Sequence, residues 1–172
     1  MNMLKGAWWA VFVIALAVYG WMVLVTLAGI QAEAGGLRPF DMRPMGYSVE
    51  EARAFLAALS DAGREIYLGP QRLLDSIYPA LLAIVLGGAA WMLFSKTWVR
   101  ATLIFTALVG MLADYTENVA IGFLLDFPGG DAPDGMIEAA SRATVVKSTL
   151  TGIVMVVVLI GLFRFLRNRR GA

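Results

Sequence analysis

Four long apolar stretches divide the chain of 172 residues. A helix needs about 20 apolar residues to cross the hydrocarbon core of a membrane, and each stretch is long enough. The pattern predicts an all-α integral membrane protein, a single domain over residues 1–172 folded as a four-helix bundle. The predicted spans cover about residues 6–30, 70–95, 98–126 and 141–165.

The one substantial polar segment, residues 31–69, joins the first two spans. Within it, Ser48 and Glu51 have the spacing of a capping box, which opens a helix. Apolar residues then recur at helical spacing, at Ala52, Phe55, Leu56 and Leu59. We expect a capped amphipathic helix over residues 48–62, ended by Gly63. It is too short and too charged to span, so it should lie on the bundle or in the membrane interface.

The charges predict an orientation for the bundle. All acids except Asp114 and Glu117 lie in or beside the first and third loops. The chain ends and the turn between the second and third spans are basic instead, with Lys5, Lys96, Arg100, Arg164, Arg167, Arg169 and Arg170. The positive-inside rule places both termini in the cytoplasm and the long first loop outside. The expected location is the bacterial inner (plasma) membrane.

Composition narrows the chemistry. The chain is 59% hydrophobic and contains neither cysteine nor histidine. Thiolate nucleophiles, Ser-His-Asp catalysis and the usual zinc sites are therefore excluded. We interpret the basic C-terminal tail as a topology signal and expect no binding to nucleic acid. We also expect no cofactor and no metal. Any chemistry must use carboxylates, lysine, tyrosine or hydroxyl groups.

The third span carries three polar residues that need a reason to be in a membrane. Each acid near a helix centre costs roughly 2.5–3.5 kcal/mol on insertion scales. Asp114, Glu117 and Asn118 share an arc of roughly 100° on one helix face. This face should point toward protein, while Leu112 and Val119 on the opposite face should point toward lipid.

Helix rise places a lysine of the fourth span at the same height. Glu117 lies about 25 Å along its helix from Arg100, and Lys147 lies about 25 Å from Arg164. We therefore predict that Asp114, Glu117 and Lys147 face one another, and we assign them as candidate catalytic residues. The candidate ligand-binding residues at about this level are Asn118, Tyr115, Tyr78, Asp75, Arg72, Thr144, Ser148 and Thr151.

Three functions fit this arrangement. The first is an outward-facing ionisable pocket that binds a small hydrophobic or lipid-like molecule, with acid–base chemistry open to its carboxylates. The second is a proton- or cation-coupled transporter that works as a homo-oligomer, since membrane acids are typical of proton relays. In the third, the polar cluster only ties helices together, because buried charges require partners whatever the function. The expected partners are membrane lipids.

Overall fold

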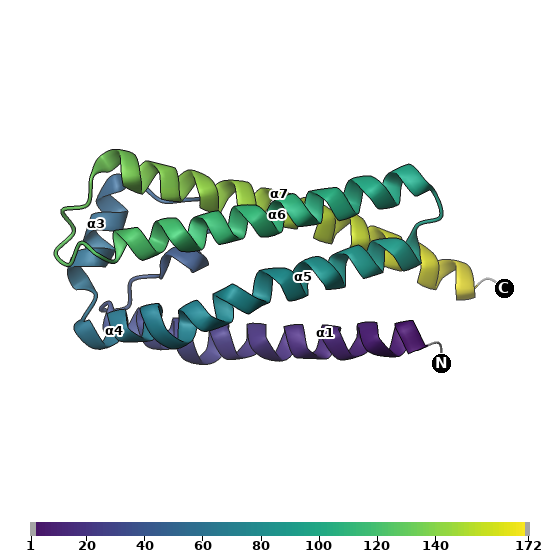
Figure 1. The fold of residues 1–172 in the computed structure, drawn as a ribbon, viewed down its shortest axis with the longest axis horizontal. Coiled ribbons are helices and arrows are strands. Elements are labelled where there is room, and N and C mark those ends of the chain that lie inside the picture. The colour runs from purple at the N-terminus through teal and green to yellow at the C-terminus, as the bar shows by residue number, and fades with distance from the viewer. Residues whose placement is uncertain (1–2, 171–172) are drawn as a thin grey trace.

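The computed structural model describes residues 3–170. Within that part, four helices are long and apolar enough to cross a membrane, which confirms this part of the prediction: Met3–Glu33, Asp61–Leu93, Thr97–Leu124 and Asp134–Arg169. They run along one common axis, and the N- and C-terminal ends lie at the same end of the bundle (Figure 1). We call this the terminal end, and the opposite end, which holds α3 and α4, the loop end.

Two of the spans are built from several helical pieces. The first comprises α1 (Met3–Trp21), the π-helical turn η1 (Met22–Thr26) and α2 (Leu27–Glu33). The second comprises α4 (Asp61–Ile66), the π-helical turn η3 (Tyr67–Gln71) and α5 (Arg72–Leu93). The remaining helices are the short 3₁₀ turn η2 (Phe40–Met42), α3 (Val49–Ala58), α6 (Thr97–Leu124) and α7 (Asp134–Arg170).

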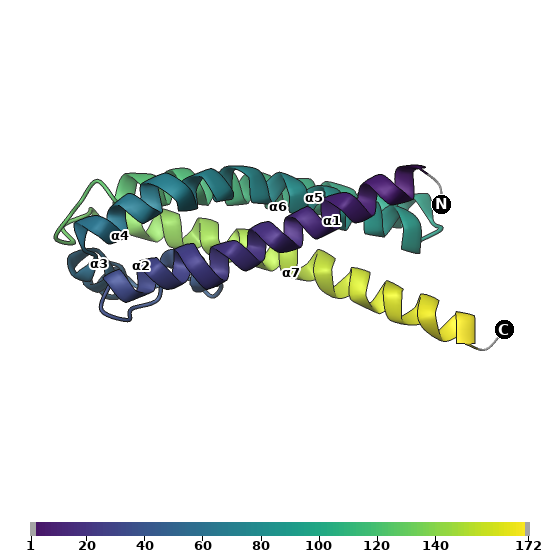
Figure 2. The same ribbon diagram turned by 90° about the horizontal axis from the view of Figure 1, so that it is seen from below.

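Helix α6 packs against both α5 and α7, and α1 packs against α5. A small core near the terminal end joins α5, α6 and α7 through Leu86, Ala90, Leu103, Ala107 and Val154. Toward its C-terminus, α7 diverges from the other three long helices (Figure 2). Leu112 and Val119 are more than half exposed, as expected for the lipid-facing side of α6.

The approach of α1 to α5 depends on one glycine. A Cβ atom on Gly88 would lie only 2.3 Å from the Trp8 ring. The same ring donates a hydrogen bond from Nε1 to the carbonyl oxygen of Val85, at 3.1 Å. Gly88 therefore lets the two helices pack closely around an indole, as small residues do at helix contacts in membranes.

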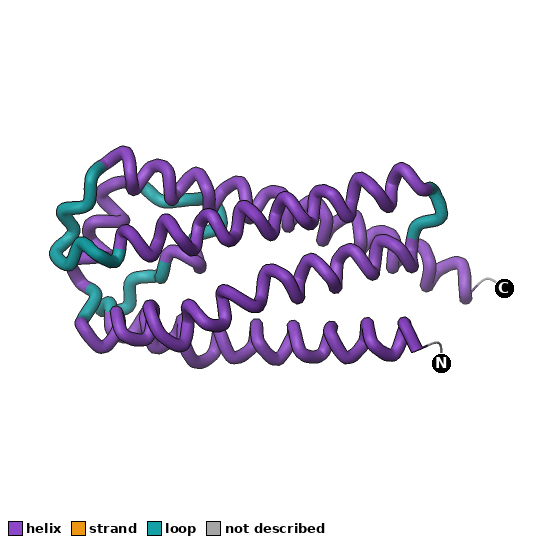
Figure 3. Tube along the Cα trace, in the orientation of Figure 1, coloured by secondary structure: helices purple, strands orange, loops and turns teal. Residues whose placement is uncertain are grey.

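The larger core lies at the loop end, where most connecting segments gather (Figure 3). Its fully buried large side chains include Ile30, Phe40, Phe55, Leu56, Leu124, Leu125 and Ile137. Helix α3 starts with the capping box: the Ser48 hydroxyl accepts from Glu51 N, and Glu51 accepts from Ser48 N. Phe40 and Phe55 contact each other with ring centroids 4.8 Å apart. The first loop thus packs onto the bundle and covers its loop end.

The helix expected over residues 48–62 is shorter than predicted. It ends at Ala58, and a second helix, α4, begins at Asp61 because the Ser60 side chain caps it by accepting from Gly63 N at 3.1 Å. Gly63 does not end a helix but lies inside α4. A Cβ there would meet Glu33 Cβ at 2.7 Å, so glycine permits the close packing of α4 on α2.

The second and fourth spans also begin earlier than residues 70 and 141. Helical structure runs without interruption from Asp61 to Leu93, and Pro70 lies inside the π-helical turn η3. The fourth helix starts at Asp134, directly after Pro133, with an acid in its first turn. An acid there interacts favourably with the helix dipole, so helix formation extends into the acidic loop.

The side of the membrane on which each end lies is a testable prediction from the charge distribution. A reporter fused after residue 172 should be found in the cytoplasm, and one inserted at residues 129–131 should be found outside, because basic flanks stay inside. Enzyme reporters active on only one side of the membrane measure this. Two reporters active on the same side would contradict the four-span arrangement.

Candidate functional site

A lysine of α7 lies between two carboxylates of α6. Lys147 Nζ is 2.5 Å from Glu117 Oε2 and 3.0 Å from Asp114 Oδ1. The Thr144 hydroxyl, one turn before Lys147, donates to Glu117 Oε1 at 2.5 Å. Asp114 and Glu117 are three residues apart on α6, and so are Thr144 and Lys147 on α7, so each pair lies on one helix face. We call these four residues the Lys147 cluster.

The Lys147 cluster is closed within the protein. Glu117 is fully buried, and both of its carboxylate oxygens have a donor. Because a buried ion pair is tolerated only when its hydrogen bonds are satisfied, this geometry suits a structural tie between α6 and α7.

The first loop places a tyrosine over this cluster. Ser141 on α7 holds the backbone of Tyr47: Tyr47 N donates to its Oγ, which donates to the Tyr47 carbonyl oxygen, both at 2.9 Å. The Tyr47 hydroxyl is buried and has no hydrogen-bond partner among residues 3–170. Burial, reinforced by the nearby Glu117 carboxylate, raises the pKa of Tyr47, so the hydroxyl stays protonated at neutral pH.

A second polar group connects α5 to its neighbours. Gln71 is fully buried; its Oε1 accepts from the Thr26 hydroxyl, and its Nε2 donates to Asp75 Oδ2 at 2.8 Å. Asn118 Nδ2 donates to the carbonyl oxygen of Asp75 at 3.0 Å. Thr26 and Gln71 both lie in π-helical turns, which often occur at functional sites. We call Thr26, Gln71, Asp75 and Asn118 the Asp75 group.

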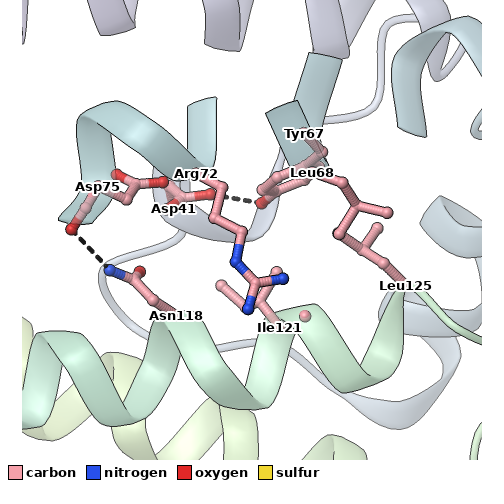
Figure 4. A pocket seen from close by; sticks show the side chains of 9 residues that line it. Asp41, Tyr67, Leu68, Arg72, Asp75, Asn118, Ile121 and Leu125 are labelled. Carbon is pink, nitrogen blue, oxygen red and sulfur yellow. Dashed lines mark hydrogen bonds between the residues drawn. The ribbon is translucent and has the colours of Figure 1, made fainter. Parts of the chain in front are cut away.

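A pocket opens beside the Asp75 group, between the start of α5 and the end of α6 (Figure 4). Its volume is about 20 Å³. A cavity of this size holds about one ordered water molecule. The lining residues are Asp41, Tyr67, Leu68, Arg72, Asp75, Asn118, Ile121, Gly122 and Leu125.

The charged groups of the pocket are not paired with each other. Within residues 3–170, none of the salt bridges involves Asp41, Arg72 or Asp75. Asp41 accepts a hydrogen bond from the Tyr67 hydroxyl. The Arg72 guanidinium extends toward α6 (Figure 4), where a Cβ on Gly122 would lie 3.5 Å from Arg72 Nη1. The two carboxylates and the guanidinium are therefore available to bind a ligand.

The predicted site residues divide between these places. Asp114, Glu117, Lys147 and Thr144 meet in the Lys147 cluster, whereas Arg72, Asp75 and Asn118 line the pocket. Tyr115, Tyr78, Thr151 and Ser148 lie apart from both. The single constellation expected from helix rise is thus two neighbouring groups, one where α6 contacts α7 and one where it contacts α5.

Tyr115 donates from its hydroxyl to the carbonyl oxygen of Ser76, at 3.2 Å. Tyr78 stacks on Tyr19 with ring centroids 5.7 Å apart. Thr151 packs against α6 at Gly110, where a Cβ would be 3.2 Å from the threonine Oγ1. Ser148 is half-buried and lies one residue after Lys147. Tyr115, Tyr78 and Thr151 thus lie at helix contacts, and none of the four lines the pocket.

The sequence analysis missed Asp41, Tyr67, Gln71, Thr26 and Tyr47. Gln71 carried a usable signal, because it precedes Asp75 by four residues and so shares its helix face. Asp41 and Tyr47 carried none, since Asp41 lies in the three-residue turn η2 and Tyr47 in the loop before α3, both too irregular for a period to fix the direction of a side chain. Thr26 is an isolated hydroxyl in an apolar span, which is compatible with any helix contact.

In the described part of the chain, no three His, Cys, Asp or Glu side chains are placed to hold a metal ion. No family model, curated protein or solved structure matches the chain. The fold itself defines the class: four helices of membrane-spanning length and apolarity are those of a multi-pass membrane protein.

Proposed function

We propose that this membrane protein binds the polar head of a lipid-like molecule in the pocket between α5 and α6. The observation that carries the proposal is the set of charges in that pocket, Asp41, Arg72 and Asp75, which form no ion pairs within residues 3–170. Asp75 is buried and Asp41 is half-buried, and carboxylates without a charged partner are costly there, so a cationic partner is expected for them. Arg72 is exposed at the edge of the pocket, where its guanidinium is free to bind an anion.

The position of Arg72 supports a ligand from the membrane. From Leu73 to Leu93, α5 has a single charged residue, Asp75, so Arg72 marks the boundary of the apolar run. A guanidinium at this boundary lies at the level of lipid head groups. In the orientation that the positive-inside rule predicts, this is the outer leaflet.

The Lys147 cluster has a positioning role in this proposal. Its ion pairs join α6 to α7, and Asn118 follows Glu117 directly in sequence. Fixing α6 in this way fixes the Asn118 amide and its bond to the Asp75 backbone. The cluster thus has the structural role considered above, in which it ties helices together, and the carboxylates left to bind a ligand are Asp75 and Asp41.

Native mass spectrometry of the full-length protein tests the proposal. After purification in a mild detergent with mixed bacterial phospholipids, the wild-type protein should retain a bound amphiphile. The double variant Arg72→Gln/Asp75→Asn should lose it, because both charges that hold the head are gone. Arg142→Gln is the matched control, since Arg142 makes an exposed salt bridge to Glu138 on α7. Equal lipid retention in all three proteins, or none in the wild type, would overturn the proposal.

A further inference from the structure

A second, apolar groove lies along the same pair of helices as the polar pocket. Its volume is about 410 Å³. Its walls carry no charge and come from α5 and α6 alone: Ala80, Ala83, Ile84, Gly87, Gly88, Ile104, Leu108 and Met111. A groove with these walls can bind a hydrocarbon chain, but its side chains offer no hydrogen-bonding group to a water-soluble ligand.

Helical spacing puts the pocket and the groove on one continuous seam. Steps of three and four residues keep positions on one helix face. On α5 these steps connect Arg72, Ser76, Ala80, Ala83 and Gly87. On α6 they connect Gly122, Asn118, Tyr115, Met111, Leu108 and Ile104. The hydrogen bond from Tyr115 to Ser76 crosses the seam between the two hollows. We call this surface the α5–α6 seam.

The seam is long enough for an acyl chain. From Arg72 to Gly87 it extends about 22 Å at 1.5 Å per residue. One leaflet of the hydrocarbon core is about 15 Å deep. A molecule with its head at Arg72 can therefore lay a chain along the seam through the whole of its own leaflet.

The pocket lies at the Arg72 end of the seam, and its charges are complementary to those of a zwitterion. Asp75 is 7% exposed, and its side chain accepts a single hydrogen bond within residues 3–170, from Gln71. A carboxylate can accept about four. Asp41 adds a second carboxylate, and Arg72 supplies a guanidinium at the α6 side of the pocket (Figure 4). The acids fit a cation, and the guanidinium fits a phosphate, with which it pairs readily.

The free acceptor positions of the pocket select the kind of cation. A primary ammonium has three N–H donors, which the carboxylates of Asp41 and Asp75 can accept. A trimethylammonium group has no N–H to donate. The acceptors of the pocket therefore favour a primary amine over a quaternary one.

From this geometry we infer that the ligand is a phospholipid with a primary amine, of the phosphatidylethanolamine type. Its ammonium lies between Asp41 and Asp75, its phosphate on Arg72, and one acyl chain along the α5–α6 seam. This inference rests on the proposed function and specifies the substrate class of the same pocket.

Binding of defined lipids to the full-length protein tests the inference without any variant. In detergent micelles doped with one lipid at a time, phosphatidylethanolamine should bind at least about tenfold more tightly than phosphatidylcholine or phosphatidylglycerol of the same chains. Free phosphoethanolamine should bind far more weakly than the lipid, because it makes no contact with the seam. Asp75→Asn should reduce phosphatidylethanolamine binding to the phosphatidylcholine level, while Arg142→Gln should leave it unchanged.

The outcomes separate the inference from the function on which it rests. Equal binding of all three phospholipids, or a preference for phosphatidylglycerol, would overturn the amine selectivity and leave the lipid site standing. Binding of free phosphoethanolamine as tight as that of the lipid would show that the ligand comes from water, which overturns the role of the seam. Binding of no lipid at all would overturn both proposals.

Discussion

Replacing Lys147 with methionine should destabilise the protein by roughly 3–5 kcal/mol, the cost of removing one partner from a buried ion pair. The reason is geometric: Lys147 is the cation that contacts both Asp114 and Glu117, and Glu117 is fully buried. Equilibrium unfolding in mixed micelles measures the loss. The triple variant Lys147→Met/Asp114→Asn/Glu117→Gln should recover most of it, because the uncompensated charges are then gone.

The matched control for Lys147 lies on the same helix. Arg142 forms a salt bridge with Glu138, and the two side chains are 78% and 54% exposed. Arg142→Met should change the free energy of unfolding by no more than about 0.5 kcal/mol, as is usual for exposed pairs on a helix. If Lys147→Met cost no more than this, or if the triple variant were as unstable as the single one, the three groups would not form one buried ion pair.

Gly130→Ala should destabilise the loop end by roughly 2–4 kcal/mol, because a side chain at this position meets two penalties. Gly130 has a φ of +83°, which L side chains rarely adopt, and an added Cβ would lie 2.6 Å from the carbonyl oxygen of Arg53. The neighbouring atoms belong to the backbone of α3, so they cannot rotate away. The same unfolding measurement detects the loss.

Gly129 separates the two penalties. Its φ is +113°, but an added Cβ would meet no atom within 4 Å. Gly129→Ala therefore carries the backbone strain alone and should be less destabilising than Gly130→Ala by about 1–3 kcal/mol. Equal effects of the two variants would show that the α6–α7 connection does not dock against α3.

Regular helices made part of the site predictable from sequence. The rise of an α-helix is constant, and buried charges need partners, so the heights of Glu117 and Lys147 were enough to indicate that they pair. In the structure, Lys147 Nζ lies 2.5 Å from Glu117 Oε2. The two faces of α6 were harder to separate. Asn118 is adjacent to Glu117 in sequence, yet it bonds α5 while Glu117 bonds α7.

Irregular backbone set the limit of prediction. Asp41 and Tyr47 reach the bundle from a loop whose path follows from its packing, not from a periodic pattern. Thr26 lies in a π-helical turn, where the residues per turn differ from 3.6 and the helix face shifts. A sequence read with the α-helical period alone cannot align the faces on either side of such a turn. Of these residues, Asp41 lines the pocket, Thr26 bonds Gln71 beside it, and Tyr47 lies over the Lys147 cluster.

The order of the Lys147 cluster along the chain has a consequence for biosynthesis. Asp114 and Glu117 are synthesised in α6, about 30 residues before Lys147. The insertion machinery therefore receives a helix with two acids whose partner, Lys147, is still inside the ribosome or its exit tunnel, at a cost of roughly 2.5–3.5 kcal/mol for each acid. The last helix relieves that cost when it enters. Its arrival changes α6 from a weakly inserted segment into a fixed wall of the pocket, so the site can form only after α7 has been synthesised.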